Sequence, residues 1–145
     1  MYEEFITMSN VNVLRGLHFQ YKMPQTKIVS VLNGAVVDVI VDLRKSSPTY
    51  LKSIKVNINA NNNYSIYIPK GCAHGFLSLC NNTIMLYMCE GKYDKKSDSG
   101  IRYNDPELNI DWGINTDDII ISERDQSLLW LHDFMKISDK DDVFL

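Results

Sequence analysis

The stretch Val36-Val37-Asp38-Val39-Ile40-Val41-Asp42 decides the fold class. Its residues alternate in character, which is typical of a β-strand because successive side chains of a strand point to opposite faces. Val37, Val39 and Val41 fall on one face, and we expect that face to belong to the core. Short apolar segments of the same kind recur along the chain, at residues 26–32, 35–43, 51–58, 64–68, 75–79 and 83–89.

Residues that close turns separate these segments: Asn33-Gly34, Ser46-Ser47-Pro48, Asn61-Asn62-Asn63, Pro69-Lys70-Gly71 and Asn81-Asn82. Short strands at this spacing predict an all-β fold, either a barrel or a sandwich. Residues 94–112 are polar and contain Gly100 and Pro106, so we expect a long ordered loop there. After it, residues 117–122 are compatible with a short strand and residues 126–135 with a short helix.

Length and composition limit the possible classes of protein. The 145 residues fit a single domain over residues 1–145. The net charge of −3 gives no basic surface for nucleic acid, and no apolar run reaches the roughly 18 residues that would span a membrane. No secretory signal is visible in the sequence, so we expect a cytoplasmic protein. Cys72, Cys80 and Cys89 form no Cys-x-x-Cys pair, and we expect them to be free thiols buried on strands.

Two histidines stand in unusual surroundings. His74 ends the pattern Pro69-x-Gly71-x-x-His74, which resembles the second signature of the cupins. The His-x-His signature of metal-binding cupins is missing, so we expect a barrel without metal. The remaining chemistry is that of acids and bases. A histidine such as His18 can abstract a proton near neutral pH, and a cation such as Lys27 or Arg15 can stabilise the resulting enolate.

The order of the motifs resembles the dTDP-4-dehydrorhamnose 3,5-epimerase family over about residues 9 to 126. The matching elements are Val13-Leu14-Arg15-Gly16-Leu17-His18-Phe19-Gln20, Pro24-Gln25-x-Lys27, the stretch from Gly34 to Thr49, Ile68-Pro69-x-Gly71-x-Ala73-His74-Gly75-Phe76, Gly100-Ile101-Arg102-x-Asn104-Asp105-Pro106 and Ile121-Ser122-Glu123-Arg124-Asp125. The resemblance implies a homodimeric jelly-roll cupin. It also implies epimerisation of a nucleotide-activated 4-keto-6-deoxy sugar without metal or organic cofactor, in deoxysugar and surface polysaccharide biosynthesis.

The resemblance also implies the catalytic residues. His18 matches the base that removes the proton beside the C4 ketone, and Asp125 matches the acidic partner that orients it. Lys27 matches the lysine near the ketone oxygen, and Tyr87 the tyrosine that returns a proton from the opposite face. On residue type alone, Tyr87 could equally be a core tyrosine, Lys27 a solvated lysine at a strand end, and Asp125 the N-cap of the following helix.

The substrate-binding residues follow from the same resemblance. Arg15 matches an arginine that contacts the nucleotide diphosphate, a group that a guanidinium binds in bidentate fashion. Tyr93 matches a second tyrosine of the pocket. Gln20, Arg44 and His74 line the pocket by analogy, although Arg44 could also be a turn residue that anchors a loop.

The chain departs from the family pattern in three places. Further strands normally precede the Arg15 motif, so we expect an N-terminally shortened member. The usual Trp-Pro pair is Trp112-Gly113, and Asp98 stands in place of a glutamate. These changes leave open a heptose, a 6-deoxyhexose or an amino sugar as substrate.

Two other functions also stay open. A cupin 3,4-ketoisomerase would use the same proton chemistry to move the ketone. A catalytically silent cupin would bind a sugar nucleotide without turning it over.

Overall fold

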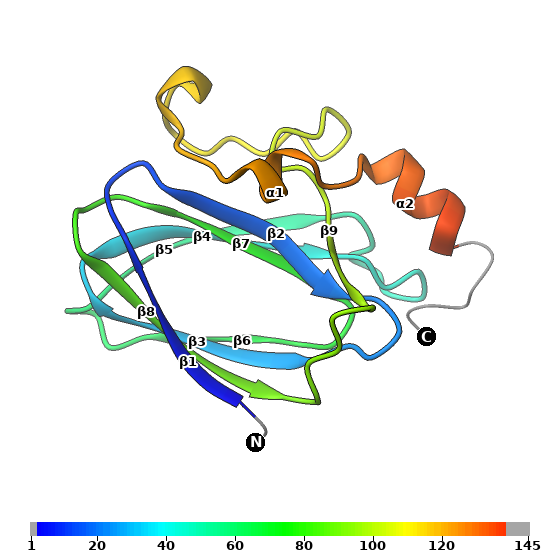
Figure 1. The fold of residues 1–145 in the computed structure, drawn as a ribbon, viewed down its shortest axis with the longest axis horizontal. Helices are drawn as coiled ribbons and strands as arrows, with labels where there is room; N and C mark the ends of the chain where they lie inside the picture. The colour runs from blue at the N-terminus through cyan, green and yellow to red at the C-terminus, as the bar shows by residue number, and fades with distance from the viewer. Residues whose placement is uncertain (1–2, 139–145) are drawn as a thin grey trace.

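Two antiparallel β-sheets face each other in the computed structural model, which describes residues 3–138 (Figure 1). The four-stranded sheet has the order β1 (Glu3–Ser9), β8 (Thr83–Glu90), β3 (Thr26–Asn33) and β6 (Ser65–Ile68). The five-stranded sheet has the order β5 (Ser53–Asn59), β4 (Ala35–Asp42), β7 (Cys72–Ser78), β2 (Leu14–Gln20) and β9 (Asp98–Gly100). The predicted all-β fold is therefore confirmed, whereas a single domain over residues 1–145 stays a prediction.

Every apolar segment found in the sequence contributes to a strand, but three strands, β1, β2 and β9, were not predicted. β1 pairs with β8 along its whole length, from Glu3 opposite Cys89 to Ser9 opposite Thr83. β9 lies inside the predicted loop and pairs with β2. β2 itself pairs with β7 and β9. All three strands depend on partners far away in the sequence, which a local pattern does not reveal.

The region after the loop differs from the prediction. Instead of a strand over residues 117–122, a 3-10 helix covers Thr116–Asp118 and Ile120 makes an isolated bridge to Val13. The single helix predicted over 126–135 is wrong, because two helices occur there: α1 (Glu123–Gln126) and α2 (Leu131–Ser138). The break has a clear cause, since Leu129 forms a bridge with Ile101 between the two helices.

The strand β4 buries both of its faces. Val37, Val39 and Val41 are core residues, as predicted, and pack under the C-terminal segment with Trp112 and Phe134. The opposite face points between the two sheets, where the second core lies: Val29, Val31, Val36, Ile58, Ile68, Phe76, Met85, Tyr87 and Cys89. Asp38 belongs to this inner face and is almost completely buried.

The cysteines are only partly as predicted. All three are free, but Cys89 alone is buried, whereas Cys72 is half-buried and Cys80 is exposed. Cys80 lies in the turn between β7 and β8 rather than on a strand. Among residues 3–138, no helix is long and apolar enough to cross a membrane.

Candidate active site

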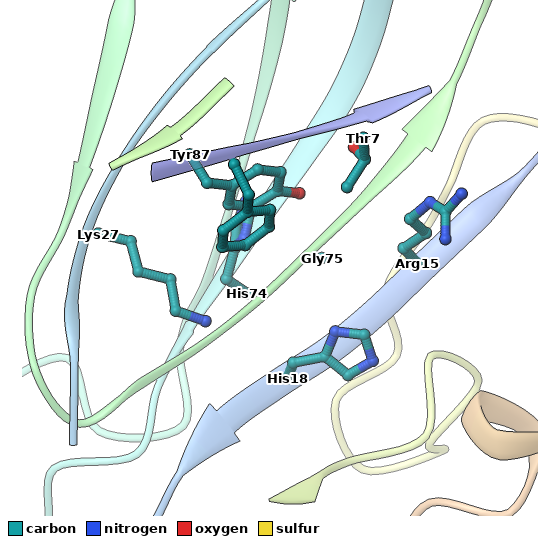
Figure 2. Close-up of a pocket in the computed structure, with 8 residues that line it drawn as sticks. Thr7, Arg15, His18, Lys27, His74, Gly75 and Tyr87 are labelled. Carbon is teal, nitrogen blue, oxygen red and sulfur yellow. The ribbon is translucent and has the colours of Figure 1, made fainter. Parts of the chain in front are cut away.

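A cavity opens between the two sheets, with a volume of about 180 Å³. Its lining comes from both sheets (Figure 2): Phe5, Thr7, Arg15, His18, Lys27, His74, Gly75 and Tyr87. A second cavity of about 240 Å³ shares Phe5, His18 and Lys27 with it. The two cavities therefore adjoin, and they bring together most of the predicted site residues.

A β-bulge in β2 turns His18 toward the cavity. Strict alternation would place Arg15 and His18 on opposite faces of the strand because they are three positions apart. Arg15 lies opposite Phe76 of β7 and His18 opposite His74, and the register shifts between these two pairs. The shift corresponds to a bulge, which re-aims the side chains that follow it. As a result Arg15 and His18 both line the cavity, while Leu17 between them joins the outer core.

Two glycines allow β2 and β7 to approach each other closely at the bulge. Gly16 has φ +121°, a backbone conformation that other residues rarely adopt. A Cβ atom on Gly16 would lie 2.6 Å from the Cα of Gly75, and one on Gly75 would lie 2.7 Å from the carbonyl oxygen of Arg15. Glycine is therefore required at both positions to hold Arg15 and His18 where they are.

Asp125 fixes the ring of His18. The His18 Nε2 atom lies 2.7 Å from Asp125 Oδ1, and the backbone N–H of Gly16 donates to Asp125 Oδ2 at 3.0 Å. The carboxylate can only accept, so Nε2 carries a proton, and in the neutral form of the imidazole the lone pair is on Nδ1. This is the arrangement that a histidine base requires.

Asp125 is not the N-cap of the helix that contains it. Ser122 caps α1, and its hydroxyl accepts the backbone N–H of Asp125. Burial alone would raise the pKa of Asp125. The hydrogen bonds from His18 and Gly16 outweigh burial and hold that pKa below its usual value. Asp125 therefore stays ionised beside the imidazole.

Lys27 is not a solvated lysine at a strand end. It lies on the inner face of β3, opposite Cys89 of β8, and its amine points into the cavity toward His18 (Figure 2). Burial lowers the pKa of Lys27, although the nearby Cys89, Asp98 and Glu3 oppose this effect. The cavity therefore holds one amine close to the imidazole.

Tyr87 lies on the four-stranded sheet, across the cavity from His18 (Figure 2). Its ring is 8% exposed, and burial together with the charge of Asp38 raises the pKa of its phenol. His74 packs edge-on against the ring with centroids 6.1 Å apart, and its Nε2 lies 2.8 Å from Asp38 Oδ2. The phenol is thus kept protonated, on the wall of the cavity opposite the strand that carries His18.

Two of the predicted binding residues, Arg15 and Tyr93, line different cavities. Arg15 donates to the hydroxyl of Ser9 and to the carbonyl oxygen of Met8, so the end of β1 fixes its guanidinium at the cavity. Tyr93 lies in the second cavity and donates to Asp98, which also accepts from Arg124.

The amide of Gln20 is engaged by the backbone. It donates to the carbonyl oxygens of Met23 and Lys92 and accepts the N–H of Asp94, although the residue still lines the second cavity. Arg44 is not among the described residues that line either cavity. Its guanidinium makes two hydrogen bonds to the carboxylate of Asp42, at 2.8 and 2.9 Å. The structure therefore does not bring Arg44 to the site.

Three residues at the site were not expected from the sequence. Phe5 and Thr7 reach the cavity on β1, a strand that no local pattern announces. Asp38, which holds His74, did leave a signal, because it is a carboxylate at an alternating position of a strongly apolar segment. Among residues 3–138, no group of three or more His, Cys, Asp and Glu side chains is placed to hold a metal ion.

Comparison with known proteins relates this architecture to one family. Residues 1–133 match the sequence profile described as dTDP-4-dehydrorhamnose 3,5-epimerase. The curated protein of that name from Methanothermobacter thermautotrophicus is 47% identical over 122 residues, which is 83% of this chain and 66% of the relative. The chain likewise spans 70% and 64% of the lengths of the proteins of the same name from Escherichia coli and Shigella flexneri.

Solved structures agree with the sequence match. The crystal structure of dTDP-4-dehydrorhamnose 3,5-epimerase from Elizabethkingia anophelis has a TM-score of 0.88 at 42% identity, covering 90% of this chain and 72% of that one. The Legionella pneumophila enzyme, solved in complex with dTDP-4-keto-L-rhamnose, has a TM-score of 0.85 at 38% identity, covering 90% of this chain and 69% of that one. The predicted cupin-type jelly roll is thereby confirmed.

Proposed function

Because the chain belongs to the dTDP-4-dehydrorhamnose 3,5-epimerase family, we propose that it epimerises a nucleotide-activated 4-keto-6-deoxy sugar at C3, C5 or both. One observation carries the proposal: His18 and Tyr87 lie on facing walls of one cavity. Inversion at carbon needs a base on one face of the sugar ring and a proton donor on the other. The positions of His18 and Tyr87 on facing walls support these two roles.

The first step is removal of a proton from the carbon beside the C4 ketone. Nδ1 of His18 takes this proton, and the electrons of the C–H bond move into the enolate. The resulting imidazolium is stabilised by the carboxylate of Asp125. The negative charge on the enolate oxygen is stabilised by the ammonium group of Lys27, which lines the same cavity.

The second step completes the inversion. The phenol of Tyr87 gives its proton to the carbon from the opposite face, and the enolate returns to the ketone. The phenolate then takes a proton from water, and His18 releases the abstracted proton to water. Protons therefore balance over one turnover, and the reaction needs no oxidant or reductant.

The nucleotide end of the substrate has its own set of residues. We assign the diphosphate to Arg15, because β1 fixes its guanidinium at the cavity. Tyr93 borders the second cavity and we assign it to the same substrate, while Gln20 and His74 shape the walls. Arg44 is the exception. Its pairing with Asp42 supports a role in anchoring the loop between β4 and β5.

We propose the cytoplasm as the location of the protein.

We propose that the partner of the chain is a second copy of itself. The outer face of the four-stranded sheet carries apolar side chains that are more than half exposed: Ile6 58%, Met8 59%, Leu32 53% and Tyr67 63%. Exposed large apolar side chains on one sheet face are typical of an interaction surface. Sedimentation should give a dimer, and Met8→Glu should yield a monomer. A wild-type monomer at micromolar concentration would contradict the assembly.

The activity is tested directly by product analysis. The protein is incubated with dTDP-4-keto-6-deoxyglucose in deuterium oxide, and the sugar is followed by NMR. We expect deuterium at C3, C5 or both, together with the inverted product. A product with the ketone at C3 would instead show a ketoisomerase. Tight binding without any deuterium incorporation would show a silent cupin.

A further inference from the structure

Phe5 forms a parallel ring stack with Tyr87. The two residues lie directly opposite each other in the pairing of β1 with β8, so their side chains share the inner face of the sheet. Their ring centroids are 4.7 Å apart and their planes differ by 7°. One face of the tyrosine ring is therefore covered by a phenylalanine that the proposed reaction does not use.

Phe5 is exposed in a way that its partner is not. Its side chain is 45% exposed, whereas Tyr87 is 8% exposed. Phe5 also lines both cavities, each time together with His18 and Lys27. Phe5 therefore lies between the buried ring of Tyr87 and the open cavity, and it covers one face of that ring.

The ring of Tyr87 has a second aromatic neighbour, His74, which is itself hydrogen-bonded. His74 meets the tyrosine ring edge-on, with an angle of 65° between the ring planes, and Asp38 holds His74 in turn. The β8 backbone fixes only the Cα atom of Tyr87, so its ring orientation depends on the side chains around it, which include Phe5 and His74 at the ring and Thr7 at the hydroxyl. Phe5 can be substituted without disturbing the buried Asp38–His74 pair.

We propose that Phe5 is a positioning residue that holds the ring of Tyr87 for proton delivery and thereby determines how often the enolate is protonated on the inverting face. The inference rests on the proposed function and adds a determinant of stereochemical outcome to it. An aromatic stack of this geometry contributes about 0.5–1.5 kcal/mol beyond area burial, which corresponds to roughly two- to tenfold in a rate ratio.

The enolate has two fates, and Phe5 affects only one of them. Protonation by His18 returns the starting configuration, and in deuterium oxide it leaves deuterium at the carbon after the abstracted proton has exchanged with solvent. Protonation by Tyr87 gives the inverted product. A loosened Tyr87 slows the second path alone, so the ratio of inversion to exchange should fall while proton abstraction continues.

The test measures that ratio in deuterium oxide for the wild type, Phe5→Ala and Phe5→Leu. We expect Phe5→Ala to lower the ratio about two- to tenfold, with total proton abstraction changed less than the ratio. Phe5→Leu keeps apolar bulk without a flat ring and should lie between the two. Glu4→Ala, an exposed position on the same strand, should keep the wild-type ratio and controls for the pairing of β1.

The possible results separate the two claims. A wild type without exchange would overturn the proposed function and this inference with it. Normal wild-type exchange and inversion, with an unchanged ratio in the folded Phe5→Ala protein, would overturn the role of Phe5 alone. If Phe5→Ala does not fold, the ratio in Phe5→Leu decides: a reduced ratio supports the inference, and a wild-type ratio overturns it.

Discussion

His18 and Asp125 lie 107 positions apart in the sequence, and their side chains meet at 2.7 Å. The same carboxylate also accepts the N–H of Gly16, which belongs to the bulge that turns His18 into the cavity. Asp125 therefore holds both the imidazole and the strand that carries it. The orientation of the proposed base is set by one residue from the far end of the chain.

Replacing Asp125 by Asn should lower kcat by about 10²–10⁴, because a neutral amide neither fixes the tautomer of His18 nor stabilises its imidazolium. Steady-state kinetics with a 4-keto sugar nucleotide gives the measurement. Asp118→Asn changes an exposed carboxylate and should match the wild type. An Asp125→Asn protein with more than half of the wild-type kcat would show that His18 works without this partner.

Replacing Tyr87 by Phe should separate exchange from inversion. The substitution removes the proton donor and leaves the ring stack with Phe5 in place. We expect deuterium to enter the substrate at a rate close to that of the wild type, with inverted product reduced at least about a hundredfold. NMR of the reaction in deuterium oxide reports both quantities. Tyr64→Phe, on an exposed tyrosine, serves as the control. Undiminished inversion would identify another donor.

Replacing Lys27 by Met should raise stability while reducing activity. Burial lowers the pKa of Lys27, so between that lowered pKa and the ordinary 10.5 the unfolded chain binds more protons than the folded one. The free energy of unfolding of the wild type should therefore rise with pH across this window. The Lys27→Met variant should not show this rise. At neutral pH the variant should melt higher, by about 2–4 °C for each kcal/mol gained.

Calorimetry from pH 7 to 10 tests this prediction, with Lys52→Met at an exposed position as the control. A variant that melts lower than the wild type at pH 7 would mean that the ammonium group of Lys27 stabilises the fold. Retained activity in the same variant would remove Lys27 from the reaction.

Replacing Gly16 by Ala should destabilise the protein by roughly 1–3 kcal/mol and impair catalysis, because the new Cβ would meet Gly75 at 2.6 Å. Gly113→Ala is a matched control, since Gly113 also has a positive φ of +81° but nothing lies within 4 Å of its added Cβ. Urea unfolding of both variants isolates the effect of the clash. Equal losses in the two variants would mean that the close approach of β2 and β7 is not required.

Much of the fold follows from local pattern, whereas the site does not. The alternation over residues 36–42 predicts β4 and its buried valines because side-chain period and burial are local properties. The meeting of His18 with Asp125 is not local, and only the resemblance to a family indicated it. The bulge in β2 and the placement of Phe5 on β1 depend on strand pairing, which residue type and spacing do not encode.

We propose that His18 abstracts a proton from a carbon beside the C4 ketone of a nucleotide sugar. The most direct test compares deuterium incorporation by the wild type and by His18→Ala at equal concentration, with circular dichroism as a check of folding. We expect rapid incorporation at C3 or C5 with the wild type and a loss of about 10²–10⁴ in the rate of incorporation with the variant. Incorporation at the wild-type rate in folded His18→Ala would contradict it.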